Sequence, residues 1–540
     1  MQQLSAQDAQ FLYMETNKSF SQVTSVSIFD PSTAPGGHVR FKQIIEQVRK
    51  RLHTSPIYKR RIYHVPLELD YPYWIEDEHF DIEYHIRHGR LPYPADWRQL
   101  CIHLARFHSR PLDLQRPPWE MYVIEGLDNI DGLPKGCYAL ATKIHHAAAD
   151  GMAIINFFAG LMDIDVQGTP VMESKQTITS ERFEKPTPVQ MGLRSLVNGA
   201  RSPLKVADTL MRHAPNIVKT MKREIVEQQR EAKQSVPSTR FNLETSPHRV
   251  FDCTTFELND FKPIRGLAKG STINDIVLTI CSGAIREYLG HHKELPAESL
   301  KAFAPVNTRK KRRDKDNADQ PGNNISTMSP TLYTNIADPV ERLKAIQAET
   351  QQQKAAKRGI SARLMTDVTK HIPASTQLLA ARLMMRSEMA GRMTNVCISN
   401  VPGPVVPVYM NGAKCISTMA LGPLSDRMGL FIAVASYNGK ITFNVTSCRR
   451  TMPDIAFFIE CLISSKEALF NAAKKAPPRV TKTTAKKRAK AKTAGKKAKK
   501  KAKLVSKTAS KTKNKKAATK KKAKKTPQKK SAKKLSAKPK

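Results

Sequence analysis

The chain has 540 residues, of which 40% are hydrophobic and 25% charged, with 90 Lys and Arg against 47 Asp and Glu. Residues 474–540 hold 31 of these basic residues and no acidic residue, which leaves 59 basic and 47 acidic residues in 1–473. The formal charge of +43 therefore does not make the whole chain a nucleic-acid binder. The chain combines a mildly basic body and a polycationic extension. Its length suits two to four units with sizeable cores.

The first unit is predicted over 1–183 and mixes strand and helix patterns. Apolar and polar residues alternate in Gln22–Phe29, which indicates a strand, and apolar residues recur at helical spacing in Phe41–Leu52. The apolar run Met152–Met162 is predicted to form a helix.

Prolines and basic amphipathic stretches occupy 184–249, which we interpret as a crossover between domains. In the longest stretch one helical face carries Ile217, Val218, Met221 and Ile225. Packing on the body and contact with a membrane surface are both consistent with this face.

A second mixed unit is predicted over 250–473. It opens on a strand at Arg249–Glu257 and a helix at Thr272–Leu289, and Asn438-Gly439 between two apolar runs predicts a hairpin with a type I′ turn. The amphipathic run with Leu378, Leu379, Leu383 and Met384 fits core packing, an acyl passage or a bilayer contact. Two α+β units joined by a crossover place the expected site at their interface.

The eight cysteines show no C-x-x-C spacing, so we expect buried free thiols in a reducing compartment. The sequence has no 18-residue apolar run and its N-terminus lacks the pattern of a secretory signal. We therefore expect a cytoplasmic protein without a transmembrane span.

The most informative segment runs from Gly136 to Gly151, where a strand-like run ends in His145-His146-Ala-Ala-Ala-Asp150-Gly151. Neighbouring strand residues point to opposite faces, so the two histidines cannot share one role. An imidazole suits a general base near neutral pH, and the small residues leave room for substrate. Packing and metal binding are the alternatives, but no third ligand stands at a zinc spacing, so no metal is predicted.

Several segments resemble those of the bacterial wax ester synthase/diacylglycerol acyltransferase family. His145–Gly151 fits the H-H-x-x-x-D-G signature of the CoA-dependent acyltransferase superfamily. The narrower resemblance lies in four blocks: Leu4–Glu15, Pro111–Trp119 with Pro118 where leucine is usual, Thr272–Leu278 and Ile398–Pro404. Together they cover about residues 1–470 in the expected order.

The resemblance implies an α+β fold of two chloramphenicol-acetyltransferase-like domains. It also implies acyl transfer from fatty acyl-CoA to a long-chain alcohol or diacylglycerol, with His146 as base, His145 and Asp150 as structural support, and no cofactor. Gly151 and Asn274 are candidates for contact with substrate or oxyanion, although Asn274 also suits a helix cap. For the remaining motif residues we expect structural roles, including a rigid turn over Asn400–Pro404: Asp113, Arg116, Trp119, Asp275, Ser399, Asn400, Pro402 and Gly403.

The lysine-rich segment 474–540 lacks the apolar content to bury itself and is predicted to be disordered until it meets a polyanion. Nucleic acid and an anionic membrane or lipid-droplet surface are both candidate partners, and water-insoluble acceptors favour the lipid surface. Two rival functions are a condensation-type enzyme that uses carrier-protein thioesters and a catalytically silent scaffold that acts through this segment.

Overall fold

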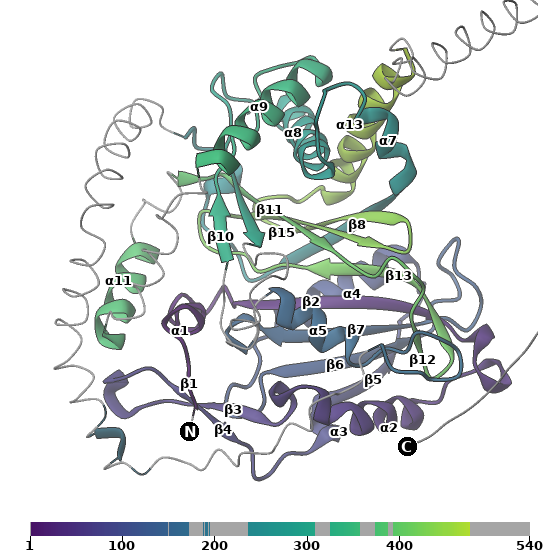
Figure 1. Ribbon diagram of the computed structural model, residues 1–540, viewed down its shortest axis with the longest axis vertical. Coiled ribbons are helices and arrows are strands. Elements are labelled where there is room, and N and C mark those ends of the chain that lie inside the picture. The colour runs from purple at the N-terminus through teal and green to yellow at the C-terminus, as the bar shows by residue number, and fades with distance from the viewer. Residues whose placement is uncertain are drawn as a thin grey trace, which may run out of the picture. The chain divides into compact units, whose positions relative to one another are not determined.

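The computed structural model describes residues 2–148, 151–171, 187, 190–192, 194, 236–307, 325–356, 373–386 and 393–475. Most of the predicted crossover, including Ile217–Ile225, lies outside these residues, as do Asp150 and the lysine-rich segment from residue 476 onward. The described part contains two six-stranded sheets and one three-stranded sheet (Figure 1).

The first large sheet has the strand order β12-β13-β2-β7-β6-β5. Its neighbours are antiparallel except for the parallel pair β5 and β6. Its central strand β7 is buried along its whole length because helices cover both faces of the sheet. The strands are β2 (Gln22–Asp30), β5 (Ile86–Arg90), β6 (Trp119–Glu125), β7 (Tyr138–His145), β12 (Tyr409–Met410) and β13 (Ala413–Leu421).

Strands β12 and β13 come from the predicted 250–473 unit but pair with the first sheet. β13 runs antiparallel to β2, with Leu421 opposite Thr24 and Lys414 opposite Asp30. A register shift between Cys415 and Ser417 bends this pairing. The two parts of the chain are therefore joined by a shared sheet, while the domain boundaries remain a prediction.

The second large sheet has the order β10-β9-β11-β14-β15-β8, and helices α7, α8, α9 and α13 gather on one side of it (Figure 1). Apolar residues of α8 and α13 form one buried core with β14 and β15. The strands are β8 (Arg249–Glu257), β9 (Ala302–Asn307), β10 (Ile325–Met328), β11 (Val396–Pro402), β14 (Leu430–Tyr437) and β15 (Lys440–Cys448). The helices are α7 (Phe261–Ile264), α8 (Ile273–His291), α9 (Pro339–Ala356) and α13 (Ile455–Lys475).

Two local predictions for this part are confirmed. β8 spans the predicted residues, and β14 and β15 form the predicted hairpin with Tyr437 opposite Lys440. Asn438 has a φ of 44° and Gly439 a φ of 82°, as a type I′ turn requires.

The other helices pack around the first sheet. α2 (Phe41–Arg51), α3 (Ile82–His85) and α5 (Gly151–Ala159) cover one face, and α4 (Trp97–Ser109) covers the other. α4 also contacts β8, where the Trp97 indole N–H donates to Asp252 at 2.9 Å. A three-stranded sheet of β1 (Gln2–Gln3), β4 (Tyr73–Glu76) and β3 (Arg60–Tyr63) lies next to α1 (Ala6–Tyr13).

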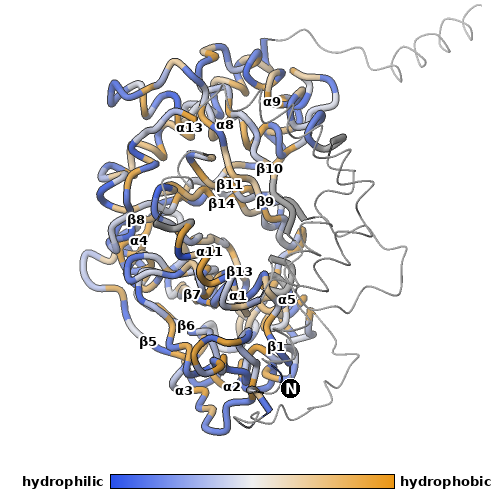
Figure 2. Tube along the Cα trace, turned by 90° about the vertical axis from the view of Figure 1, so that its left-hand side faces the viewer, coloured by the Kyte–Doolittle hydropathy of each residue, from blue (hydrophilic) through white to orange (hydrophobic). Residues whose placement is uncertain are grey.

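Helix α11 (Ala374–Arg386) carries the amphipathic run noted in the sequence. Ala374 and Ala381 are buried against α1, and Leu378 packs beside them. Leu379 and Leu383 are 60% and 59% exposed, so core packing accounts for only one face of this helix. Figure 2 shows the hydrophobic residues along α11.

The described residues contain no helix that is both long and apolar enough to span a bilayer. All eight cysteines are free, and all except Cys253 are buried, as expected from their apolar surroundings. Burial raises the pKa of Cys397 and Cys281, which leaves these thiols unreactive.

His108, at the end of α4, connects three segments of the fold. Its Nε2 donates to the Gly422 carbonyl at 3.1 Å, and its Nδ1 accepts from the Thr24 hydroxyl at 2.8 Å. Gly422 directly follows β13, so this side chain links α4 and β2 to the returning strand. Burial lowers the pKa of His108 to about 3, with smaller contributions from Arg249 and Lys143.

This arrangement predicts a loss of stability in mild acid. Between the unfolded pKa of 6.5 and the folded value of about 3, only the unfolded chain binds the proton, so the contribution of His108 falls as pH drops below 6.5. From pH 7 to pH 5 wild type should lose about 2 kcal/mol more unfolding free energy than His108→Gln. Urea unfolding of both proteins at the two pH values checks this, and equal losses would contradict it.

Candidate active site

The two histidines of the motif lie where β7 ends and the 3₁₀ turn η6 (His146–Ala148) begins. His145 is the last residue of the strand and pairs in register with Gln22 of β2. The backbone N–H of His146 donates to the Ser21 carbonyl at 2.7 Å, which continues this pairing by one residue. The pairing with β2 therefore fixes the backbone positions from which the two adjacent imidazoles point in different directions.

His145 is buried, and both of its ring nitrogens have partners. Nε2 donates to Glu15 Oε1 at 2.9 Å, and Nδ1 accepts from the Ala147 N–H at 3.1 Å. The same Glu15 oxygen accepts the Ser21 N–H at 2.7 Å. These bonds define one tautomer of His145 and tie the η6 turn to the segment after α1.

His146 is half-buried and has different surroundings. Its ring stacks on Phe11 of α1, with ring centroids 4.0 Å apart and an interplanar angle of 20°. Ala147 and Ala148 pack against α1 in the same small core as Phe11. Helix α1 therefore supports the turn and orients the His146 ring. The motif then continues into α5 at Gly151, while Asp150 lies outside the described residues.

Sequence reasoning assigned no role to Phe11 or Glu15. Both lie in the N-terminal block that carried the family resemblance, so the sequence contained a signal that these residues matter. Their partners are about 130 residues away, and no local pattern names such a partner.

The Asn274 motif and the Ser399–Pro404 motif lie together. The Asn400 side chain donates to Asn274 Oδ1 at 3.4 Å. The alternative interpretation of Asn274 as a helix cap is wrong. Thr272 caps α8, and Asp275 completes the capping box. The buried Asp275 carboxylate accepts from Thr272 N at 2.7 Å and from the Thr350 hydroxyl at 2.7 Å. Asn274 is thus held in the first turn of α8 by its neighbour.

The predicted turn over Asn400–Pro404 begins later than expected. Residues through Pro402 belong to β11, with Ser399 opposite Ala433 of β14. Gly403 follows, and a Cβ at this position would overlap the Ser436 carbonyl oxygen. Glycine is required there because the backbones of the two segments approach closely.

The block Pro111–Trp119 leads into β6 of the first sheet. Asp113 and Arg116 form a partly exposed ion pair of 3.7 Å, and the Arg116 guanidinium lies 3.8 Å from the Tyr84 ring centroid. Trp119 is buried, and its indole N–H donates to the Tyr58 carbonyl at 3.1 Å. In the described part of the chain, no three His, Cys, Asp or Glu side chains are grouped as metal ligands.

Family models match both parts of this chain. The model of the wax ester synthase/diacylglycerol acyltransferase catalytic domain matches residues 4–277, and that of the WS/DGAT C-terminal domain matches residues 321–469. A Mycobacterium tuberculosis (strain CDC 1551 / Oshkosh) protein that bears the name diacylglycerol O-acyltransferase is 31% identical over 459 residues, which cover 84% of this chain and 87% of that protein.

Solved structures give the same result. The wax ester synthase/diacylglycerol acyltransferase from Marinobacter aquaeolei VT8 has a TM-score of 0.60 and 25% identity, over 87% of this chain and 100% of that chain. Trichothecene 15-O-acetyltransferase from Fusarium sporotrichioides has a TM-score of 0.53 at 10% identity, over 86% of this chain and 94% of that chain, and shares the fold alone. The predicted α+β, chloramphenicol-acetyltransferase-like fold is confirmed. The chain belongs to the wax ester synthase/diacylglycerol acyltransferase family and is an acyl-CoA-dependent O-acyltransferase that uses an alcohol or diacylglycerol as acceptor.

Proposed function

We propose that His146 is the general base in the transfer of a fatty acyl group from acyl-CoA to a long-chain alcohol or to diacylglycerol. One observation carries this assignment: the two adjacent imidazoles are used differently. Both nitrogens of His145 are engaged by Glu15 and Ala147, whereas His146 is half-buried and oriented by Phe11. Stacking on Phe11 fixes the direction of the His146 ring, and a general base must be held in a fixed direction toward the proton that it takes.

In the proposed reaction, His146 takes the proton of the acceptor hydroxyl as that oxygen attacks the thioester carbonyl carbon. A C–O bond forms and a tetrahedral oxyanion develops. The C–S bond then breaks, and the CoA sulfur takes the proton back from the imidazolium. Ester and free CoA are the products, and no acyl-enzyme is needed, which agrees with the raised pKa of buried Cys281 and Cys397.

The oxyanion needs hydrogen-bond donors, and we assign this role to Asn274 and the backbone at Gly151. Asn274 Oδ1 accepts from Asn400, which leaves the Asn274 amide NH₂ as its donating side. In this proposal Asn400 and Asp275 position Asn274, and His145, Glu15 and Asp150 position the motif turn.

His146→Ala should lower kcat for acceptor-dependent CoA release from palmitoyl-CoA by at least about a hundredfold, because the hydroxyl loses its proton acceptor. Thiol release is followed with hexadecanol and, in parallel, with dipalmitoylglycerol, and the lipid product is identified. The control is His291→Ala, which removes an exposed histidine of the second His-His pair. Unchanged activity of His146→Ala would refute the assignment, and release from a carrier-bound acyl group but not from CoA would favour a condensation-type enzyme.

Glu15→Ala should lower kcat with little effect on KM, because Glu15 positions the turn and does not contact substrate. The change leaves the His145 and Ser21 N–H groups without their acceptor, so unfolding free energy should also fall by about 2 kcal/mol. Glu15→Gln keeps an acceptor oxygen and should restore most of both quantities. Steady-state kinetics and urea unfolding separate the effects. Equal damage by the two substitutions would show that charge, not positioning, is what Glu15 contributes.

We propose further that the enzyme works as a peripheral protein at an anionic membrane or lipid-droplet surface. Residues 477–540 carry 29 Lys and Arg and no acidic residue, and each basic residue near such a surface contributes about 1 kcal/mol. Exposed Leu379 and Leu383 on α11 supply apolar contact. Both acceptor classes are water-insoluble, so residence on lipid brings enzyme and acceptor together.

Deletion of 477–540 should reduce sedimentation with vesicles of phosphatidylglycerol and phosphatidylcholine, because it removes the positive charge and leaves α13 intact. Binding of the full chain should weaken as salt rises and be low on pure phosphatidylcholine. Vesicle binding that survives the deletion unchanged would contradict this proposal. Duplex DNA that displaces the full chain from vesicles at equal charge would favour nucleic acid as the partner.

A further inference from the structure

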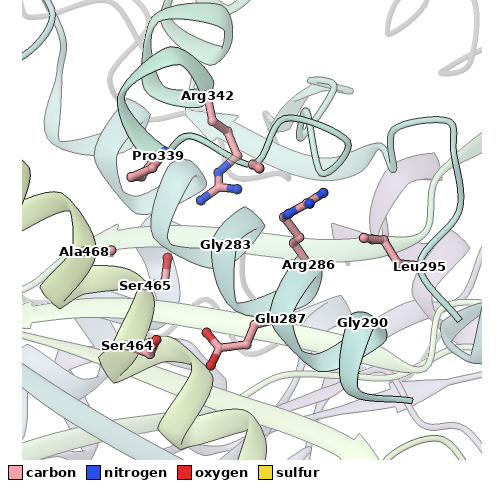
Figure 3. A pocket seen from close by; sticks show the side chains of 11 residues that line it. Gly283, Arg286, Glu287, Gly290, Leu295, Pro339, Arg342, Ser464, Ser465 and Ala468 are labelled. Carbon is pink, nitrogen blue, oxygen red and sulfur yellow. The ribbon is translucent and has the colours of Figure 1, made fainter. Parts of the chain in front are cut away.

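A cavity of about 390 Å³ lies between α8, α9 and α13, in the second half of the chain (Figure 3). It opens to solvent beside Glu287 and Gly290. Gly283 on its wall is nine residues after Asn274 on the same helix, which corresponds to roughly 14 Å along the helix axis. The cavity is therefore distinct from the end of α8 that carries the motif.

Two arginines line this cavity without a carboxylate partner. Arg342 is only 4% exposed, and one of its terminal nitrogens donates to the Ile336 carbonyl at 2.8 Å. Arg286 donates to the Thr334 carbonyl at 2.7 Å. Backbone carbonyls carry no net charge, and in the described part of the chain neither guanidinium forms an ion pair. Buried charges are normally paired, whereas the two guanidinium groups at this cavity are not. The cavity therefore holds positive charge that no described carboxylate compensates by direct contact.

Two further polar atoms at the cavity have no hydrogen-bond partner within the described structure: Arg342 Nε and the hydroxyl of Ser465, which is 5% exposed. Both side chains converge over Gly283 (Figure 3). A Cβ on Gly283 would overlap the Ser465 hydroxyl and lie 2.9 Å from a terminal nitrogen of Arg342. Glycine at this position is what allows the hydroxyl and the guanidinium to approach each other.

The electrostatics agree with this geometry. Burial and, to a smaller extent, the neighbouring Arg286 lower the pKa of Arg342 to about 10, while Asp338 acts in the opposite direction. Asp338 uses its carboxylate to cap α9, accepting from Val340 N and Glu341 N at 2.9 and 2.8 Å. Glu287, the one acidic residue of the cavity lining, is exposed at its opening, where Figure 3 shows its carboxylate pointing away from Arg342.

We propose that this cavity binds the phosphate group of a small ligand, held by Arg342 and Arg286 with the Ser465 hydroxyl as a third donor. A guanidinium group matches the geometry of phosphate oxygens, and the anion would compensate both cations. The apolar residues Leu295, Ala337, Pro339 and Ala468 line the remaining space, which suits the organic part of a phosphate ester. This ligand site is separate from the proposed acyl-transfer chemistry.

Isothermal titration of the full chain with inorganic phosphate and with glycerol 3-phosphate, at constant ionic strength, tests the proposal. Arg342→Gln and Arg286→Gln should each raise Kd about tenfold or more. Lys344→Gln is the matched control, because it removes one charge from the exposed face of α9. All three variants keep the lysine-rich segment, so phosphate bound there cancels in the comparison.

Tighter binding of glycerol 3-phosphate than of inorganic phosphate identifies an ester as the ligand, and equal affinities identify free phosphate. Arg286 is only half-buried, so its variant stays informative even where Arg342→Gln fails to fold. Phosphate affinity that is the same in wild type and in both arginine variants overturns the proposal.

Discussion

The arrangement of the site depends on how the buried imidazole of His145 is bonded. One nitrogen donates to Glu15 and the other accepts from the backbone of Ala147, so the ring cannot turn without breaking two buried hydrogen bonds. Because His146 is the next residue, the position of its backbone follows from that of His145, and its N–H donates to the carbonyl of Ser21, the residue before β2. Phe11 then sets the plane of the second ring. His145 and its acceptor Glu15 thus position His146, the residue that we propose as the general base.

The same constraint explains why the site draws on distant parts of the sequence. Glu15 and Phe11 come from the N-terminal segment, whereas Asn274 and Asn400 belong to the second half of the chain. β13 pairs with β2, the strand that also pairs with β7, so the returning segment supports the sheet from which the motif emerges at the end of β7. His108 of α4 stabilises this arrangement through hydrogen bonds to Gly422 and Thr24.

Local signals predicted much of this structure. The strand-like run of β8, the Asn-Gly turn between β14 and β15 and the helix after Thr272 each follow from neighbouring residues. The contrast between His145 and His146 also follows from strand alternation. The pairing of β13 with β2 was not predictable, because it joins residues almost 400 positions apart whose pattern suits either sheet. The partners of His145 and the convergence of Arg342 with Ser465 are likewise products of tertiary packing.

If His146 is the general base, the acceptor hydroxyl meets His146 and not His145. A crystal structure of the full chain with hexadecanol and a non-hydrolysable palmitoyl-CoA analogue tests this most directly. We expect the alcohol oxygen within about 2.6–3.2 Å of a ring nitrogen of His146 and pointing toward the thioester carbonyl position. An alcohol oxygen bound away from His146, or a His145 ring released from Glu15 to face the alcohol, would contradict it.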